Sequence, residues 1–511
     1  MPGPPLLIAL PHALSVGGVT TWAVRLINTL ASRGHPAALL LHPYDGPQLT
    51  LSLHPSVQVF RPQNLPPFGD NPGDLSTYIR HYQHAIATLA AQYAQPVTLV
   101  PNTHGDCFGI AAALTRSEPN GLRVLGWQHS DIEYDARVLA RYEPVISSFV
   151  AVSDRIDSTL RSRLPARNAD IHNIPYGVEV AALPPRRERR LGDPIRLIYT
   201  GRLEHHQKRI LALIHMSDEL TRRGINHRLT AVGNGPAAPE FLALAASRPP
   251  ITHIPPQAPD RIAALLAASD AFVLPSRFEG LSVSMLEAMA AGCVPILART
   301  DSGALQAITP GVNGLIADVA TEADDKAAGL AMADAVQQLT HRDLAAMSHA
   351  AWHTAHTRYS LDLHVDRVTA LTNAAAAAPA RQWPANLNPA FSAPPGAPGG
   401  SGSVPADGPA RLAALLNGLA GRRIILHGSG QHTLQLAPTL AASPATILAV
   451  TDDDRQRAGQ RVLDYPIISP DQARATGATD VVISSWMHQD AIYARRDLYE
   501  SQGLTVHRIY T

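Results

Sequence analysis

Short apolar runs alternate along the chain with segments whose apolar residues recur at helical spacing. Residues 5–10 form an apolar run, residues 21–32 have the helical spacing, and residues 37–41 form the next run. Three further short strands are expected at residues 97–101, 124–127 and 149–152. This alternation predicts a parallel sheet covered by helices on both faces.

The alternation begins again after a segment rich in proline and arginine, residues 181–193, which we interpret as an interdomain linker. The strands expected beyond it are 195–200, 228–232 and 271–275, and the helices are 210–223 and 260–269. The pattern therefore predicts two Rossmann-like domains in tandem, residues 1–180 and 181–372.

Residues 373–410 have low complexity, with a run of five alanines followed by a segment of proline, glycine and serine. Such a composition buries little apolar surface, so it predicts a flexible linker. Residues 411–511 then contain four more expected strands, 423–427, 446–451, 480–484 and 505–510. The expected fold class is α/β, with two tandem Rossmann-like domains and a small Rossmann-like accessory domain at the C-terminus.

Composition excludes several classes of protein. The 511 residues include 42 basic and 42 acidic side chains, and this balance argues against a nucleic-acid partner. Only two cysteines are present, Cys107 and Cys293, too far apart for a metal or redox motif, so a reducing compartment is expected. The first apolar run is too short for a signal peptide. A cytoplasmic protein is therefore predicted.

Lysine is used at only two positions, Lys208 and Lys326, whereas the other basic residues are all arginine. Lys208 lies with Arg202 in the loop that follows the strand 195–200, and ligands of open α/β sheets bind at that end of a strand. Two cations from one loop suit a diphosphate. The alternative is a basic loop that is simply solvated.

Two further segments carry candidate binding groups. Gly17 and Gly18 lie between the first strand and the first helix, where exposed amides can bind phosphate. Glu279 precedes Gly280 in a loop, and Glu287 lies in the helix expected to start near Ser282. A loop carboxylate beside helix amides can read sugar hydroxyls, although a glutamate at a helix start often only offsets the helix dipole.

These segments together resemble the retaining "glycosyltransferases group 1" family of the GT-B fold, over residues 1 to about 372. The matching pieces are, in order, Gly17-Gly18-Val19, Ser153-Asp154, Ile174-Pro-Tyr-Gly-Val178, Gly201-Arg202, Val232-Gly-Asn-Gly-Pro236, the Glu279 and Glu287 block ending at Pro295, and Gly311-Val-Asn-Gly314. The glutamate block is the most specific of them.

The resemblance implies a role for each matching residue. Arg202 and Lys208 would bind the donor diphosphate, and Glu287 would hold the ribose. Glu279 would contact the donor sugar, helped by the amides of Gly280, Leu281 and Ser282. Gly17 and Gly18 would approach the phosphates, and His129, at the end of a strand, would lie near the transferred sugar. The family usually has a glycine after the lysine, whereas Arg209 stands there and is a further candidate for the phosphate.

The implied activity is transfer of a sugar from a nucleotide-diphosphate sugar, with retention and without a metal, in cell-surface polysaccharide or glycoconjugate synthesis. No cofactor is expected beyond the donor. A saccharide, a lipid-linked sugar or a protein would be the acceptor, and peripheral contact with the inner membrane face stays open. A sugar-nucleotide epimerase of the same fold and a non-catalytic scaffold that binds a nucleotide sugar are the alternatives.

The accessory domain has its own candidate residues. Residues 427–433, His-Gly-Ser-Gly-Gln-His-Thr, lie between a strand and a helix, with Asp453 further on, and resemble the nucleotide-binding half of Rossmann domains in sugar acyltransferases. A nucleotide site and a docking module both remain open. Asp452 and Asp454 mimic a metal-binding D-x-D motif, but we interpret them as turn or ribose contacts.

Overall fold

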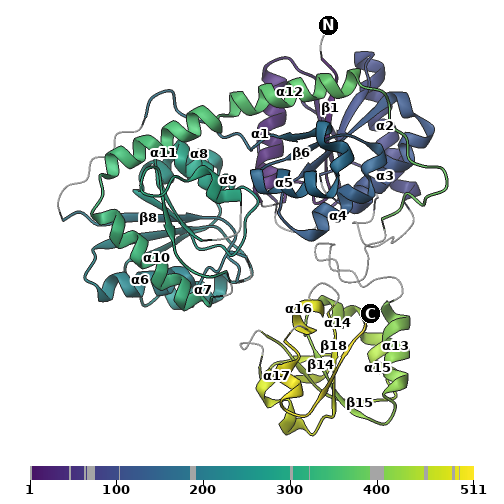
Figure 1. Ribbon diagram of the computed structural model, residues 1–511, viewed down its shortest axis with the longest axis vertical. Helices are drawn as coiled ribbons and strands as arrows, with labels where there is room; N and C mark the ends of the chain where they lie inside the picture. Colours follow the sequence, from purple (N-terminus) through teal and green to yellow (C-terminus); the bar gives the residue numbers. More distant parts are fainter. Residues whose placement is uncertain are drawn as a thin grey trace.

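The computed structural model describes most of the chain in three sheets. The described residues are 3–15, 17–44, 48–62, 65, 75–102, 104–184, 192–205, 207–299, 303–321, 323–391, 408–453, 458–485, 489–493 and 495–510. Figure 1 shows two large lobes, each a sheet between layers of helices, and a smaller third unit.

The first lobe contains a seven-stranded parallel sheet in the order β3-β2-β1-β4-β5-β6-β7. Its strands are β1 (Leu6–Leu10), β2 (Ala37–Leu41), β3 (Gln58–Phe60), β4 (Val97–Val100), β5 (Leu122–Gln128), β6 (Ile146–Ala151) and β7 (Ile171–Asn173). Its helices are α1 (Gly18–Ser32), α2 (Ser76–Tyr93), α3 (Gly105–Ser117), α4 (Glu133–Arg141) and α5 (Asp154–Arg163).

The second lobe contains a six-stranded parallel sheet in the order β10-β9-β8-β11-β12-β13. Its strands are β8 (Ile195–Thr200), β9 (His227–Val232), β10 (Ile251–Ile254), β11 (Ala271–Leu274), β12 (Val294–Ala298) and β13 (Leu315–Ala317). Its helices are α6 (Ala212–Arg222), α7 (Ala238–Ala245), α8 (Pro259–Ala267), α9 (Val283–Ala290), α10 (Asp325–Thr340) and α11 (Leu344–Arg358).

The strands are continuous apolar runs in the sequence because both faces of each sheet are buried. Every residue of β1 and of β11 is buried, because helices cover both faces of each sheet. The order of strands reverses between β1 and β4 in the first lobe, and between β8 and β11 in the second. Ligands of doubly wound sheets bind at such reversals, outside the carboxyl ends of the strands. The predicted tandem Rossmann-like architecture is confirmed.

Helix α12 (Leu361–Ala377) returns from the second lobe to the first and packs on α1, β4 and β6 (Figure 1). Its entry is fixed by Val178, whose N–H donates to the Tyr359 carbonyl at 2.9 Å and whose carbonyl accepts from Leu361 N–H at 2.8 Å. The boundary expected at residue 372 therefore falls inside a helix that belongs spatially to the first lobe.

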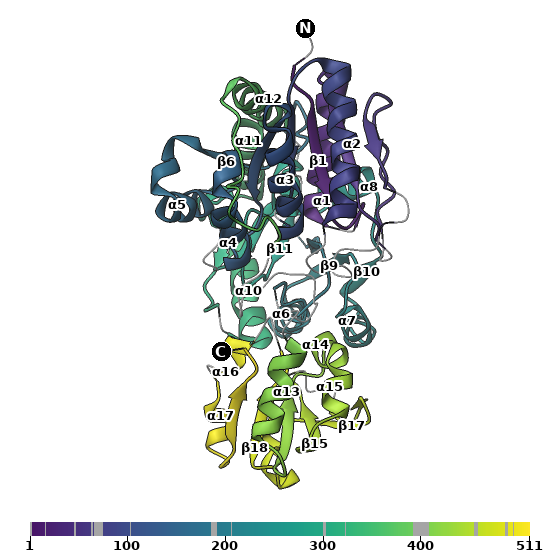
Figure 2. The same ribbon diagram turned by 90° about the vertical axis from the view of Figure 1, so that its right-hand side faces the viewer.

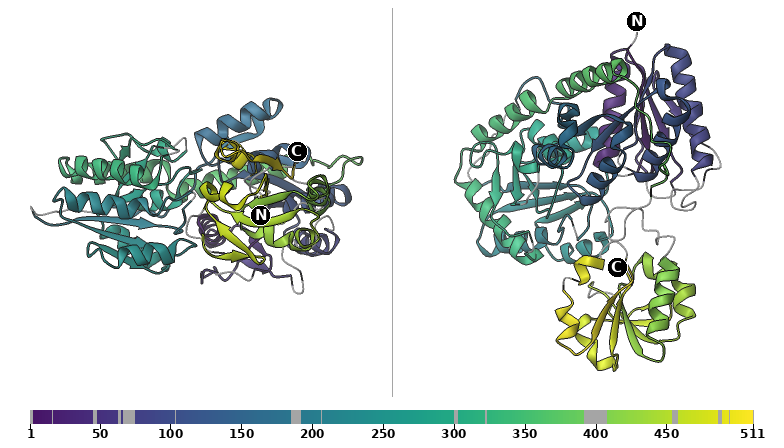
Figure 3. Two further views of the ribbon diagram at one scale, coloured as in Figure 1. Left: turned by 90° about the horizontal axis from the view of Figure 1, so that it is seen from below. Right: turned by 45° about the vertical axis from the view of Figure 1, so that its right-hand side comes forward.

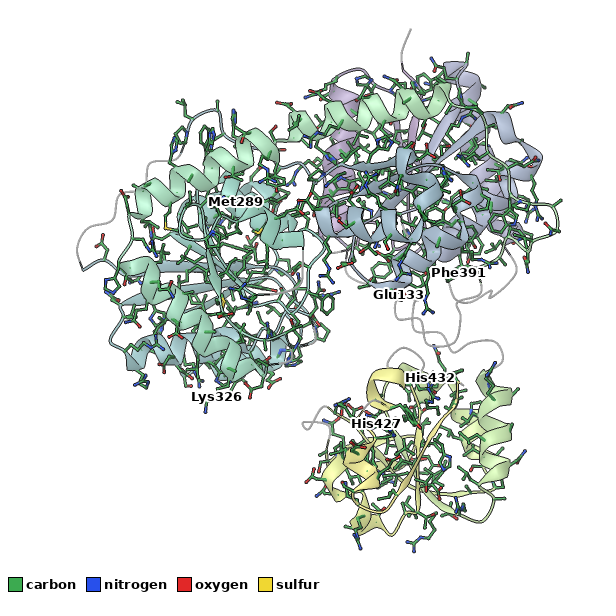
Figure 4. The ribbon with its side chains drawn as sticks, viewed as in Figure 1. Glu133, Met289, Lys326, Phe391, His427 and His432 are labelled. Carbon is green, nitrogen blue, oxygen red and sulfur yellow. The ribbon has the colours of Figure 1, made fainter. Side chains whose placement is uncertain are left out.

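Residues 379–391 continue along the first lobe rather than forming a linker. The Trp383 side chain is buried, and the Tyr142 hydroxyl donates to the Pro389 carbonyl at 2.8 Å. Figure 4 places Phe391 at the edge of this lobe. The start of the linker, expected at residue 373, is therefore too early, because residues 373–391 belong to the first lobe. Residues 392–407 of the expected linker lie outside the described residues.

The third unit has a six-stranded sheet in the order β16-β17-β15-β14-β18-β19, parallel except for the β16–β17 pair. Its strands are β14 (Arg423–His427), β15 (Thr446–Thr451), β16 (Arg461–Val462), β17 (Tyr465–Ile468), β18 (Asp480–Ile483) and β19 (Thr505–Arg508). Its helices are α13 (Gly408–Gly418), α14 (Gln431–Gln435), α15 (Ala437–Ala441), α16 (Gln489–Tyr493) and α17 (Asp497–Glu500). Helices lie on both sides of this sheet (Figure 2, Figure 3).

Candidate active site

The loops after β8 and β11 bring together the lysine and the first glutamate of the predicted site. Lys208 Nζ lies 2.5 Å from Glu279 Oε1, and both side chains are largely buried. The Lys208 loop is held by Glu204, whose carboxylate accepts from the N–H groups of Gln207 and Lys208 at 2.8 and 2.7 Å. An ammonium group therefore sits at the reversal point of the second sheet.

Arg202 lies in the same loop and is exposed. Its Nη2 is 3.4 Å from the side-chain oxygen of Gln207, and Gln207 Nε2 in turn donates to the Phe278 carbonyl at 3.1 Å. Gln207 thus ties the Arg202 side chain to the loop that carries Glu279. The two predicted cations and this carboxylate occupy one place in the fold.

Arg209 is part of the scaffold below the site. Its side chain is fully buried, and its guanidinium donates to the carbonyls of Pro275, Ser276 and Ala323 at 2.7, 3.4 and 3.3 Å. Its φ of +46° is in the left-handed region, which explains why a glycine is usual at this position. Because its donors point to carbonyls of the turn after β11 and of the loop before α10, we expect Arg209 to be structural and not a phosphate ligand.

The start of α9 meets the first lobe at His129. Ser282 is the N-cap of α9, and its hydroxyl accepts from Met285 N–H at 3.3 Å. Gly280 and Leu281, just before the cap, are buried. A Cβ at Gly280 would lie 2.3 Å from the His129 carbonyl oxygen, so only glycine allows this approach. The initial amides of α9 have no partner within the helix and form a local positive end.

Helix α1 begins at the same place from the other lobe. Gly17 is its N-cap and Gly18 its first residue, and a Cβ at Gly18 would lie 3.7 Å from Cγ2 of Val283, the first residue of α9. One turn further along α9, Glu287 Oε1 accepts from Arg25 Nη2 of α1 at 2.6 Å. Two helix N-termini therefore meet here, just beyond Glu279 along the chain, and such helix ends suit an anion with several oxygens.

His129 follows the end of β5 and is buried among aromatic rings. Its Nδ1 is 2.7 Å from the Tyr176 hydroxyl. Trp22 of α1 contacts it edge-on, with 4.7 Å between ring centroids. Burial lowers the pKa of His129 to about 3, so the imidazole is neutral at physiological pH.

The sequence pointed to Lys208, Glu279 and His129 but not to three of the side chains that contact the candidate site residues. Nothing in the sequence marks Arg25 as the partner of Glu287 or Trp22 as a neighbour of His129, since both pairs join segments more than 100 residues apart. The Pro-Tyr-Gly motif at residues 175–177 was a signal for Tyr176. The roles of the individual residues stay predictions.

The candidate residues of the third unit have hydrogen-bond partners within that unit. Asp452 accepts from Ser429 N–H at 2.9 Å, and His427 Nδ1 is 2.5 Å from the Tyr499 hydroxyl. Asp453 pairs with Arg495 at 2.6 Å. Asp454 lies outside the described residues. Figure 4 shows His427 and His432 on this unit, and whether it binds a nucleotide stays a prediction.

Neither a metal-binding cluster nor a membrane-spanning helix occurs within the described residues. No group of three or more His, Cys, Asp or Glu side chains there could hold a metal ion. No described helix has the length and apolar character needed to cross a bilayer.

Family models match both lobes. Residues 16–182 match the model described as Glycosyltransferase Family 4, and residues 194–341 match Glycosyl transferases group 1. The second match contains every strand of the second sheet, and the first match contains every strand of the first sheet except β1.

Known proteins with similar sequences are bacterial glycosyltransferases. A D-inositol 3-phosphate glycosyltransferase of Rhodococcus opacus is 38% identical over 90 residues, which cover 17% of this chain and 20% of that protein. An MMP alpha-(1->4)-mannosyltransferase of Mycolicibacterium hassiacum is 26% identical over 371 residues, covering 60% and 83%. The chain thus spans about one fifth of the first relative and most of the second.

Among solved structures, Anabaena HepE in complex with UDP and glucose has a similar fold. Its TM-score is 0.54 at 16% sequence identity, with 71% of this chain and 98% of that chain covered. The part of this chain that HepE does not cover is about as long as the third unit together with its linker.

Proposed function

The chain belongs to the group 1 glycosyltransferases, whose two-lobed GT-B fold it shares, and on that premise we propose that it transfers a sugar from a nucleotide-diphosphate sugar to an acceptor, with retention of configuration. The observation that carries the proposal is the Lys208–Glu279 ion pair, in the loop before α9, whose first residue Val283 faces Gly18 of α1. This supports a site in which a cation and a carboxylate meet a ligand near two helix N-termini.

The proposed chemistry depends on the departing diphosphate. Its negative charge grows as the glycosidic bond breaks, so groups fixed in advance around it lower the barrier. Lys208 has three N–H donors, of which one bonds to Glu279, and the others are available to phosphate oxygens. Arg202 and the amides of Gly280, Leu281 and Ser282 complete this set without a metal ion in the mechanism.

The proposed reaction is a substitution at the anomeric carbon of the donor sugar. The bond from that carbon to the diphosphate oxygen breaks, and its electron pair leaves with the diphosphate. The acceptor hydroxyl oxygen bonds the same carbon from the same face, and its proton passes to a diphosphate oxygen. In this scheme Glu279 orients the sugar, Glu287 binds the ribose, and Gly17 and Gly18 approach the phosphates from the first lobe.

The relatives suggest the class of donor, acceptor and biological role, but not the particular compounds. One relative is named as a mannosyltransferase, and one similar structure holds UDP and glucose. We infer a hexose donor and a saccharide, lipid-linked or protein acceptor, with cell-surface polysaccharide or glycoconjugate synthesis as the role. A cytoplasmic location, with or without contact at the inner membrane face, belongs to the same proposal.

The test is transfer from UDP-, GDP- and dTDP-sugars to a panel of saccharide acceptors, with products identified by mass spectrometry. Lys208→Ala and Arg202→Ala should each lower kcat/KM by about 100-fold, since each removes one preorganised donor to the developing charge. Lys326→Ala is the matched control, because this lysine is exposed on α10 and Figure 4 places it on the outer face of its lobe. Unchanged rates in both test variants would reject the proposal.

The same assay separates the alternatives. An epimerised nucleotide sugar formed without acceptor would indicate an epimerase. Binding of nucleotide sugars without turnover across the whole panel would indicate a scaffold. Transfer that persists after chelation of divalent metals would support the metal-independent scheme.

A further inference from the structure

His129 has two ring nitrogens in different surroundings. Nδ1 lies 2.7 Å from the Tyr176 hydroxyl, whereas Nε2 is buried and has no hydrogen-bond partner among the described residues. The rings of His129 and Tyr176 are almost parallel, at 7° with 5.9 Å between centroids. One nitrogen is thus engaged by the protein, and the other is left for a ligand.

The direction of the Tyr176–His129 bond follows from the relative strength of its two possible donors. The Tyr176 side chain is buried, and His129 is the one hydrogen-bond partner its hydroxyl has within the described part of the chain. Either direction leaves one hydrogen without an acceptor there, the phenolic one if Nδ1 donates and the one on Nε2 if the hydroxyl donates. A phenol is more acidic than a neutral imidazole and is the stronger donor, and an imidazole nitrogen is a stronger acceptor than a phenolic oxygen. The hydroxyl is therefore the donor, and the hydrogen on Nε2 is the one that a ligand can accept.

We propose that Tyr176 is a positioning residue that holds His129 in the neutral tautomer with its hydrogen on Nε2, so that His129 meets its ligand as a hydrogen-bond donor and not as a base. That the ligand is an oxygen of the transferred sugar or of the departing phosphate rests on the proposed function. The tautomer itself does not, because it follows from contacts within the chain.

Helix α12 fixes the backbone that carries Tyr176. His364 Nδ1 lies 2.7 Å from the Pro175 carbonyl, and His364 Nε2 accepts from Trp22 Nε1 at 2.9 Å. Since an indole N–H can only donate, His364 must carry its hydrogen on Nδ1 and donate it to Pro175. The residue before Tyr176 is thereby held by α12.

The residue after Tyr176 is equally constrained. A Cβ at Gly177 would lie 2.5 Å from Cβ of His364 and 2.9 Å from Cα of Leu361, so glycine is needed for α12 to pack here. Trp22, which donates to His364, also contacts the His129 ring. The Pro-Tyr-Gly motif therefore serves to set a tyrosine rigidly against the histidine of the site.

Electrostatics agree with a neutral donor. Burial lowers the pKa of His129 to about 3, and burial together with the charges of Asp135 and Glu279 raises the pKa of Tyr176 well above its ordinary value. The tyrosine keeps its hydrogen and the histidine gains none over the physiological range. Both side chains are therefore neutral, as the proposed hydrogen bond requires.

The direct test is the 15N spectrum of the histidine rings in the full chain, with the His129 signals assigned by their loss in His129→Gln. The expected pattern at pH 7 is a protonated Nε2 and an unprotonated Nδ1 that accepts a hydrogen bond. Tyr176→Phe should remove that bond and shift the Nδ1 resonance. A protonated Nδ1, or an imidazolium, in the wild type would overturn the proposal.

Kinetics provide the second readout. Tyr176→Phe keeps the stacked ring and should lower kcat about 10-fold or more, with the donor KM nearly unchanged, since the lost bond acts through the orientation of His129. Tyr142→Phe is the matched control, because it also removes a buried hydroxyl, one that bonds to Pro389 instead. A kcat equal to that of the control would contradict the positioning role. If the tautomer is as expected but no donor is turned over, the proposed function fails and the inference stands.

Discussion

Arg25 of the first lobe and Glu287 of the second form an ion pair across the junction, with 2.6 Å between Nη2 and Oε1. The pair leaves the second carboxylate oxygen of Glu287 for another partner, and the proposed partner is a ribose hydroxyl. Because Arg25 holds the carboxylate in place, the pair both joins the lobes and orients the group that would read the nucleotide.

Glu287→Gln tests the ribose contact. A hydrogen bond to a charged group is worth about 1.5–3 kcal/mol. The wild type should therefore prefer a ribonucleotide over its deoxyribose analogues by about 10-fold or more in competitive inhibition, and Glu287→Gln should lose most of that preference. Asp362→Asn, which makes the same change at an exposed carboxylate of α12, is the control and should retain the preference. Equal discrimination by wild type and Glu287→Gln would show that the ribose is bound elsewhere.

Gly280→Ala tests the contact between the lobes at His129. The new Cβ would meet the His129 carbonyl at 2.3 Å, so the loop carrying Glu279 must move. A displacement of about 1 Å at a reacting centre costs about 100-fold in rate, and kcat/KM should fall by that order. Gly121→Ala is the matched control, since a Cβ there meets nothing within 4 Å. Similar rates in both variants would argue against this contact being part of the site.

Arg209→Ala tests whether this arginine is structural. Its removal would leave three buried or half-buried carbonyls without a donor, so the second lobe should lose about 3 kcal/mol of stability or more. Arg202→Ala, at an exposed position, should change stability by less than about 0.5 kcal/mol. Urea unfolding of the two variants gives the comparison. A stable Arg209→Ala protein with weakened nucleotide binding would restore the phosphate role.

Asp135 gives the first lobe a pH-dependent contribution to stability. Burial raises the pKa of Asp135 to about 8, well above its ordinary value of 3.8. The folded state thus keeps a proton that the unfolded state loses, so the contribution is full below about pH 4 and is lost as pH rises through 8. Asp135→Asn is neutral throughout, and its Tm relative to wild type should rise between pH 5 and 9. Asp362→Asn, at an exposed position, should show a constant difference.

The sequence was most informative where a strand is buried on both faces. The bounds of β2 agree with the expected ones and those of β1 and β11 differ by one residue, because helices on both sides make such strands continuous apolar runs. The alanine run at the end of α12 was interpreted as a linker. Alanine favours a helix as readily as it tolerates a linker, and only packing on the first lobe, where Ala375 is buried, decides between them.

In the candidate site, too, some residues could be predicted from the sequence and others could not. Lys208, Glu279 and Gly280 could be found because their residue types and spacing carry the chemistry. The burial of Arg209 and the partners Arg25 and Trp22 could not, since each depends on contacts between distant segments. Motifs identify the groups that meet a ligand, whereas the groups that hold them are set by tertiary packing.

The most direct measurement of the central claim is protection of lysines from reductive methylation, because Lys208 and Lys326 are the only two lysines in the chain. Each site is quantified by mass spectrometry with and without saturating nucleotide sugar. The account predicts that the productive donor protects Lys208 strongly and leaves Lys326 unchanged. Equal methylation of Lys208 with and without a donor that is turned over would contradict it.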